Sequence, residues 1–333
     1  FLDVGTGPAA RRIALRSREG TPPGLFWMGG FKSDMKGTKA AALDEWAEKQ
    51  GRACTRFDYS GHGESSGAFE DGTIGQWLED SMAAFATLSG PQVVVGSSMG
   101  GWMALLLARA LKKQKMRASL AGLVLIAPAP DFTEELMWKK FQPKVRKEIE
   151  ETGYWTRPSA YDAGGYRITR KLIEEGRNHL LLGGLIETGC PVRILQGVKD
   201  EDVPWQHAIE LSSRLAQDDV VMTLVKDGDH RLSRPQDIAL IEQAVTELAA
   251  RLASEGVRHA YIDGGMVIQQ FLAAQLVENR PADAQRGEPR KRLVRLAVAA
   301  QAFEQADHAD LLHVLAIEHL VGLQRQLPDD ALD

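Results

Sequence analysis

The chain has 333 residues, of which 44% are hydrophobic and 26% charged, and its formal net charge is −5. This composition is typical of a globular protein with a sizeable core, and the acidic balance argues against a nucleic-acid-binding protein, a class that is usually strongly basic. Apolar runs such as residues 103–111 are far shorter than the roughly 18 residues of a membrane-spanning helix, so no membrane span is expected.

Patterns typical of strands and of helices alternate from residue 8 to residue 254. Strands are predicted at 11–16, 24–30, 52–59, 92–96, 120–128, 190–197 and 220–228. Helices are predicted at 37–51, 73–90, 99–114, 204–217 and 235–254. Continuous apolar strands that are separated by helices form a mostly parallel sheet covered on both faces. With right-handed crossovers, this order predicts a doubly wound α/β domain over residues 8–254.

Two segments interrupt the alternation. Residues 131–189 contain short amphipathic helical patterns and no convincing strand. An insertion of this length after a strand is long for a loop, and we expect it to form a lid. Residues 256–333 contain three more helical patterns and no strand. Isolated helices of this length are marginal in water, so this C-terminal extension is expected to pack on itself, on the domain or on a second subunit as a homo-oligomer.

Two stretches match the pattern Gly-x-Ser-x-Gly. The nucleophile elbow of a serine hydrolase needs a strand before the sharp turn and a helix after it. Residues 96–100 lie between an apolar strand pattern and a long helix pattern, whereas residues 63–67 have neither neighbour. The glycines suit such a turn because it is crowded and because the backbone of the nucleophile is strained. Ser98 is therefore the predicted nucleophile, with a purely structural turn as the alternative.

A serine hydroxyl needs a base, and that base is oriented by a carboxylate. In this type of site the chain order is serine, acid and then histidine. Among the eight histidines, only His230 follows the last strand pattern and precedes a helix pattern. His62 also follows a strand pattern but precedes the serine in the chain, and His207 lies within a helix pattern. We predict His230 as the base.

The acid is expected in the loop after the strand at 190–197. Asp200, Glu201 and Asp202 all lie there, and Asp200 is the nearest to the end of the strand. Asp202 suits a capping position of the following helix, which starts after Pro204. Asp229 suits a turn beside the base. We predict Asp200 as the acid, with Asp202 and Asp229 as alternatives.

Two backbone N–H groups are expected to form the oxyanion hole. One belongs to Met99, the residue after the nucleophile, and the other to the turn after the strand at 24–30, where Phe31 is the predicted donor. The insertion is expected to supply an apolar substrate pocket, although the same side chains could simply pack it onto the sheet. The residues predicted for this pocket are Trp138, Trp155, Leu181 and Leu182.

Five stretches resemble the α/β-hydrolase domain-containing protein ten family and its bacterial relatives. They are residues 29–40, 56–67, 94–102, 199–205 and 227–234, and the similarity extends over roughly residues 8–254. The resemblance implies an α/β-hydrolase fold and a serine hydrolase that uses neither a metal nor an organic cofactor. It also implies Ser98 as nucleophile, Asp200 as acid and His230 as base. Animal members are mitochondrial and are described as palmitoyl-protein thioesterases and as acyl-glucuronide esterases.

The predicted reaction is the hydrolysis of a carboxylic ester or thioester through an acyl-enzyme on Ser98. The substrate is expected to be a small molecule or an acylated protein, with no nucleic-acid partner. A serine peptidase and a non-catalytic binding module on the same fold are the alternatives. We expect a bacterial cytoplasmic location, although a chain that starts at Phe1 leaves a lost targeting leader open. Cys54 and Cys190 are expected to be buried reduced thiols.

Overall fold

The computed structural model describes residues 1–114, 116–158, 165–216 and 219–251. The C-terminal extension predicted at 256–333 lies outside these residues, so its helices and its role in oligomerisation stay predictions. Within the described part of the chain, no helix combines the length and the apolar character that crossing a membrane requires. Both cysteines are buried and free, as expected.

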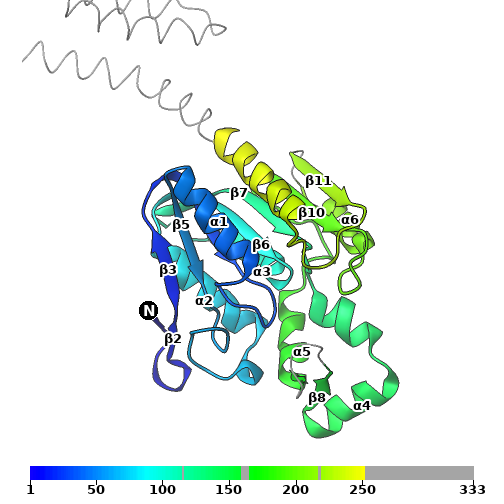
Figure 1. Ribbon diagram of the computed structural model, residues 1–333. Helices are drawn as coiled ribbons and strands as arrows, with labels where there is room; N and C mark the ends of the chain where they lie inside the picture. Colours follow the sequence, from blue (N-terminus) through cyan, green and yellow to red (C-terminus); the bar gives the residue numbers. More distant parts are fainter. Residues whose placement is uncertain (115, 159–164, 217–218, 252–333) are drawn as a thin grey trace, which may run out of the picture. The chain divides into compact units, whose positions relative to one another are not determined.

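A seven-stranded sheet forms the centre of the fold, with the strand order β11-β10-β7-β6-β4-β5-β3 (Figure 1). Only β3 runs antiparallel to its neighbour, and the other adjacent pairs are parallel. The strands are β3 (Leu15–Arg18), β4 (Thr21–Met28), β5 (Arg52–Phe57), β6 (Gly90–Ser97), β7 (Ala118–Ile126), β10 (Val192–Gly197) and β11 (Val220–Val225). The predicted doubly wound, mostly parallel α/β fold is thereby confirmed.

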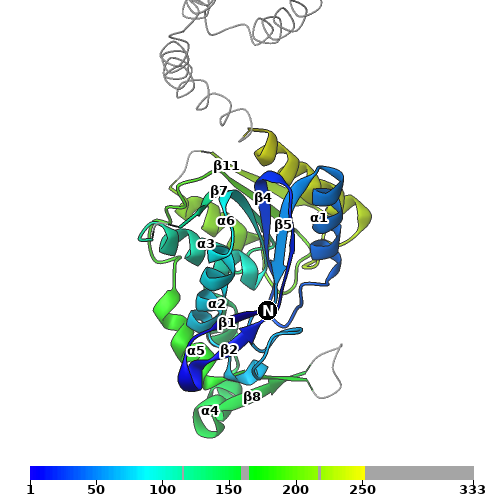
Figure 2. The same ribbon diagram turned by 90° about the vertical axis from the view of Figure 1, so that its left-hand side faces the viewer.

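Helices cover both faces of this sheet (Figure 2). On one face, α1 (Thr38–Lys49) and the helix at 235–251 pack on alternate apolar strand residues such as Val93 and Val95. On the other face, α2 (Ile74–Ala86), α3 (Met99–Leu111) and α6 (Trp205–Arg214) enclose the larger core. Because both faces of the sheet are buried, its central strands are continuous apolar runs. In β6, Val94 packs in the larger core, and Val93 and Val95 pack in the core on the other face.

The predicted strand at 11–16 divides at Ala14. Residues before it form β2 (Arg11–Ile13), which pairs antiparallel with β1 (Leu2–Val4), and a short 3-10 helix at Gly7–Ala9 joins the two. Ala14 leaves this ladder because its N–H donates to Ser65 Oγ and its carbonyl accepts the N–H of Asp58. The chain then joins the central sheet as β3.

The insertion between β7 and β10 holds more structure than the sequence patterns predict. It consists of a π-helical turn (Thr133–Met137), a 3-10 turn (Trp138–Lys140), α4 (Pro143–Thr152), β8 (Tyr154–Arg157), β9 (Tyr166–Thr169), α5 (Arg170–Gly176) and a 3-10 turn (Arg177–His179). The expectation that it contains no strand is wrong, because β8 and β9 pair antiparallel. Each is only 4 residues long, which is too short for an alternating pattern to stand out in the sequence.

The two ends of the insertion are bonded to each other. Asp131, at its start, has a left-handed φ of 56° and a buried carboxylate. That carboxylate accepts the N–H groups of Leu181 and Leu182, near the end of the insertion, at 2.8 to 3.0 Å. These hydrogen bonds therefore hold the start and the end of the helical insertion together, shortly after the carboxyl end of β7.

Candidate active site

Ser98 occupies the sharp turn between β6 and α3. Its φ of 54° and ψ of −117° are strained for a residue with a side chain, and its N–H donates to Ile126 O at 2.9 Å. A Cβ atom on Gly96 would lie 2.3 Å from the carbonyl oxygen of Gly100, and one on Gly100 would lie 2.0 Å from that of Met28. Neither position has room for a side chain, so both must be glycine. The turn places Ser98 at the carboxyl edge of the sheet.

The second Gly-x-Ser-x-Gly match forms a loop, as its sequence surroundings predict. Ser65 Oγ donates to Asp58 O at 2.7 Å and accepts the N–H of Ala14 at 2.8 Å. Ser66 Oγ accepts the N–H of Arg12 at 2.8 Å. Both hydroxyls are thus engaged with the main chain and tie this loop to the first strands.

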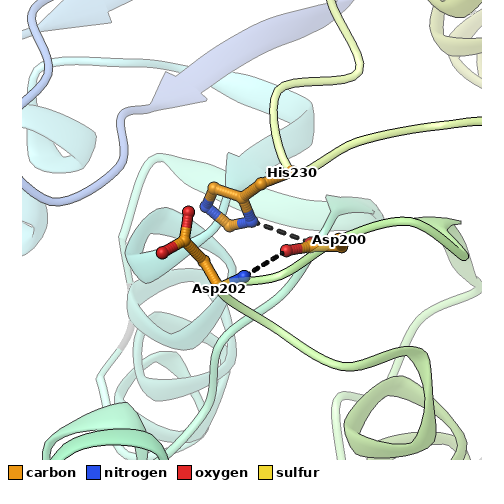
Figure 3. Close-up of side chains that lie close together, drawn as sticks. All are labelled: Asp200, Asp202 and His230. Carbon is orange, nitrogen blue, oxygen red and sulfur yellow. Dashed lines mark hydrogen bonds and ion pairs between the residues drawn. The ribbon is translucent and has the colours of Figure 1, made fainter. Parts of the chain in front are cut away.

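The structure brings Ser98, His230 and Asp200 together, although 132 residues separate the serine from the histidine. His230 Nε2 lies 3.1 Å from Ser98 Oγ. On the other side of the ring, His230 Nδ1 lies 2.8 Å from Asp200 Oδ2 (Figure 3). Since a carboxylate only accepts hydrogen bonds, Nδ1 carries a proton, and Nε2 of the neutral ring is left to accept one from the hydroxyl. The imidazole side chain is one-quarter exposed, whereas that of Asp200 is fully buried.

Four donors surround the Asp200 carboxylate. Oδ1 accepts the main-chain N–H groups of Asp202 at 3.0 Å and Val203 at 2.8 Å. Oδ2 accepts the side-chain amide of Gln196 at 3.0 Å in addition to the imidazole of His230. These four bonds fix the orientation of the carboxylate that faces His230. Gln196 was not singled out from the sequence, because its contact with Asp200 depends on how the loop after β10 folds back.

The two alternative acids have other partners. The Asp202 carboxylate is more than half exposed and pairs with Arg157, at the end of β8, at 3.4 Å. Asp229 Oδ1 accepts the N–H groups of Arg231 and Leu232, which is the turn role that its position predicts. Only the Asp200 carboxylate, of these three, hydrogen bonds to the His230 ring.

Donor atoms of Asp200, Asp202 and His230 lie within 4.8 Å of one another, a spacing that a metal ion could use. However, both Asp200 oxygens already accept N–H donors, and the imidazole is bonded to Asp200 and to the serine. A metal would have to displace these bonds. The donor set therefore fits a hydrogen-bonded acid–base pair better than a cation site.

The other two histidines considered for the base are engaged elsewhere. His62 is buried, and its Nε2 accepts the N–H of Lys32 at 3.1 Å. His207 is also buried, and its Nε2 bonds to Pro130 O at 2.8 Å. Neither ring contacts the Ser98 hydroxyl among the bonds of the described residues.

The turn after β4 lies directly beside the serine. A Cβ atom on Gly30 would be 3.4 Å from Ser98 Cβ. Within the described part of the chain, the N–H groups of Phe31 and Met99 make no hydrogen bond, and Met99 is the first residue of α3. The Phe31 ring is held edge-on by four other aromatic rings, at centroid distances of 4.9 to 5.9 Å, from Phe69, Trp77, Phe132 and Tyr166.

A cavity of about 940 Å³ opens over Ser98 and His230. Its apolar lining comes mainly from the insertion and from the turns beside the serine, namely Phe31, Met99, Ala129, Phe132, Leu136, Met137, Pro158 and Tyr166. Its polar lining includes Ser33, Asp34, Thr38, Lys39, Glu201, Asp202, Arg231 and Ser233. The lining of the cavity therefore combines an apolar wall, made of these apolar side chains, with a group of polar side chains.

None of the four insertion residues predicted for the substrate pocket lines the described part of this cavity. The guanidinium groups of Arg146 and Arg177 both lie over the Trp138 ring, which borders a separate cavity of about 230 Å³. Trp155 packs on Phe141 with ring centroids 5.3 Å apart. Leu181 and Leu182 are buried and donate their N–H groups to Asp131. These contacts agree with the alternative given from the sequence, that the four side chains pack the insertion onto the rest of the domain.

A family model described as alpha/beta hydrolase family matches residues 22–242, which is more than half of the chain. The chain belongs to the alpha/beta hydrolase family. It is 36% identical over 249 residues to "Palmitoyl-protein thioesterase ABHD10, mitochondrial" from Homo sapiens, which is 74% of this chain and 79% of that protein. The protein of the same name from Mus musculus is 38% identical over 244 residues, 73% of this chain and 80% of its own.

Two solved structures extend this comparison. A putative hydrolase from Agrobacterium vitis S4 superimposes on this hydrolase with a TM-score of 0.73 and 47% sequence identity, covering 74% of this chain and 97% of that one. Alpha/beta hydrolase domain-containing protein 10 from mouse gives a TM-score of 0.68 at 36% identity, covering 76% and 99%. The family resemblance carried by the five sequence stretches is confirmed.

Proposed function

We propose that this protein is a serine hydrolase that cleaves carboxylic esters or thioesters through an acyl-enzyme on Ser98. The observation that carries the proposal is the continuous hydrogen-bond chain from Ser98 Oγ through His230 to Asp200, at 3.1 and 2.8 Å, on a strained strand-to-helix turn. A serine activated by such a pair is the usual arrangement for nucleophilic acyl transfer.

In the acylation step, Ser98 Oγ attacks the substrate carbonyl carbon while His230 Nε2 takes the hydroxyl proton. Asp200 stabilises the resulting imidazolium, and the N–H groups of Phe31 and Met99 bind the oxygen on which negative charge develops. When the bond to the leaving group breaks, the imidazolium gives its proton to that oxygen or sulfur. Water then attacks the acyl-enzyme with His230 as base, which releases the carboxylic acid and restores the serine.

The apolar wall of the cavity supports an acyl group as the part of the substrate bound beside the serine. Phe132, Leu136, Met137 and Tyr166 supply this wall, in place of the four residues predicted from the sequence. The name of the human relative, a palmitoyl-protein thioesterase at 36% identity, agrees with an acyl ester or thioester, of either a small molecule or a protein. The cytoplasmic location expected from the sequence remains a prediction, since that relative is named as mitochondrial.

The two alternative functions, a non-catalytic binding module and a serine peptidase, predict different experimental results. A non-catalytic binding module would not react with a fluorophosphonate probe, which is attacked only by an activated serine. A peptidase would cleave an acyl p-nitroanilide as well as the matching p-nitrophenyl ester, whereas an esterase or thioesterase would leave the anilide intact.

The test is a substrate panel on the full chain. We expect fluorophosphonate labelling and turnover of p-nitrophenyl esters and acyl thioesters, with an acyl glucuronide included to probe the leaving group. Labelling without turnover of any ester or thioester, or no labelling at all, would overturn the proposal.

A further inference from the structure

The turn that carries Phe31 contains two consecutive peptide planes, each of which is held by hydrogen bonds of its own. The plane joining Gly30 to Phe31 carries the Phe31 N–H on one side and the Gly30 carbonyl on the other. That carbonyl accepts the N–H of Ser33 at 3.1 Å and its hydroxyl at 2.9 Å. The next plane, joining Phe31 to Lys32, carries the Lys32 N–H, which donates to His62 Nε2 at 3.1 Å.

His62 can hold this second plane only in one tautomer. Its Nδ1 lies 3.1 Å from Ser60 O, and because a carbonyl only accepts, Nδ1 must carry the proton. Nε2 is then the acceptor that the Lys32 N–H requires. Lys32 itself has a left-handed φ of 57°, a conformation that costs about 1 kcal/mol or more for a residue with a side chain and needs support from its surroundings.

The surroundings of His62 keep the ring neutral and in place. It packs edge-on against Tyr59, Phe69 and Trp77, with centroids 5.2 to 5.6 Å away. Burial lowers the pKa of His62 to about 4, so the ring is neutral near pH 7. The Lys32 ammonium lies over the ring of Phe69, which is one of the three rings that pack on His62. The indole N–H of Trp77 donates to the same Ser60 oxygen, which fixes that carbonyl.

We propose that His62 is a positioning residue for the oxyanion hole: it holds the Lys32 N–H and thereby aims the Phe31 N–H at the substrate oxygen beside Ser98. This inference rests on the proposed function. His62 does not touch the substrate, since its two ring nitrogens face Ser60 and Lys32. Its effect should therefore appear in the stabilisation of the transition state rather than in the binding of the substrate.

The test compares His62→Leu, which removes the acceptor, with His62→Gln, whose side-chain oxygen can stand in for Nε2. For p-nitrophenyl acetate we expect His62→Leu to lower kcat about 10- to 100-fold, somewhat less than the loss of a whole oxyanion donor, with KM changed less than threefold. Affinity for phenylboronic acid, whose tetrahedral adduct places an oxygen in the hole, should fall by a similar factor. His62→Gln should restore most of both quantities.

Val245→Ala serves as the matched control, because Val245 is fully buried in the core on the other face of the sheet. It should lower the melting temperature while leaving kcat and boronic acid affinity unchanged. A folded His62→Leu protein with the kcat and boronic acid affinity of the wild type would overturn the inference, as would equal losses in the Leu and Gln variants.

If His62→Leu does not fold, ¹⁵N-histidine NMR of the wild-type protein decides. We expect one ring with its proton on Nδ1 that does not titrate between pH 5 and 8, and a His62 proton on Nε2 would overturn the inference. Turnover by the wild type is measured in the same series. Its absence would refute the proposed function, whereas a difference between variants in an active enzyme bears on His62 alone.

Discussion

The main-chain N–H of Asp202 donates a 3.0 Å hydrogen bond to the carboxylate of Asp200, the group that faces His230 (Figure 3). The backbone of one candidate acid thus supports the side chain of the other, and the Asp202 carboxylate itself pairs with Arg157. Substitution of the Asp202 side chain leaves this backbone bond in place, so the two positions can be separated by mutation.

Asp200→Asn should lower kcat by about 10⁴-fold, because an amide cannot hold His230 in the right tautomer or stabilise its cation. Asp202→Asn should lower it by less than about tenfold, since an exposed ion pair contributes about 1 kcal/mol at most. Steady-state kinetics on p-nitrophenyl acetate distinguish the two. Similar losses in both variants would leave neither residue assigned as the acid.

Ser98→Ala should abolish fluorophosphonate labelling and reduce kcat by about 10⁴- to 10⁶-fold while the protein stays folded. Ser65→Ala is the control, because Ser65 lies in the other Gly-x-Ser-x-Gly match and its hydroxyl bonds only to the main chain within the described residues. It should keep full labelling with some loss of thermal stability. Labelling that survives in Ser98→Ala and disappears in Ser65→Ala would reverse the assignment.

Ser98→Gly should unfold at a higher temperature than Ser98→Ala. The φ of 54° at this position is strained for alanine as it is for serine, whereas glycine adopts it freely. The relief of such strain is worth about 1–3 kcal/mol, partly offset by the greater freedom of glycine in the unfolded chain. Calorimetry of the two inactive variants measures the difference, and equal melting temperatures would argue against strain at the turn.

Lys39→Met should lower kcat by about three- to tenfold. The Lys39 ammonium, in the first turn of α1, donates to the carbonyl of Arg231 and lies 3.4 Å from Ser233 Oγ, so it ties the loop that follows His230 to the start of α1. A hydrogen bond of this kind contributes about 1 kcal/mol, and 1.4 kcal/mol corresponds to a tenfold change in rate. An unchanged kcat would mean that the base loop is held without this contact.

The burial of His62 should make the protein less stable in mild acid. Its pKa is about 4 in the folded protein against an ordinary value of 6.5, so the unfolded chain binds the extra proton first. The free energy of unfolding therefore decreases as the pH falls from 6.5 toward 4, by about 2 kcal/mol at pH 5.

The difference between the wild type and His62→Gln isolates this contribution. Burial raises the pKa values of the Asp58, Asp80 and Asp131 carboxyls, which acts in the opposite direction, but these groups are common to both proteins. Urea denaturation at pH 7 and pH 5 should show a smaller decrease for the variant. An equal decrease in both proteins would mean that His62 does not carry the effect.

The sequence by itself determined the position of Ser98 in a strand–turn–helix and the succession of the central strands along the chain. These features are local: the turn depends on contiguous residues from Gly96 to Gly100, and the strands on runs such as Val93 to Val95. The sequence also predicted that Asp200 and His230 follow the last two strands. These residues were expected to meet because the carboxyl ends of parallel strands lie at one edge of the sheet.

Only the tertiary structure decided which residues of the insertion face the cavity. Short helices and four-residue strands carry too little periodicity to tell an inward side chain from a packing one, so Phe132 and Tyr166 line the cavity where Trp138 and Trp155 were predicted to lie. No local sequence pattern predicts the role proposed for His62. It depends on one hydrogen bond to a residue 30 positions away, and the parallel pairing of β4 and β5 brings the turns that carry these two residues together.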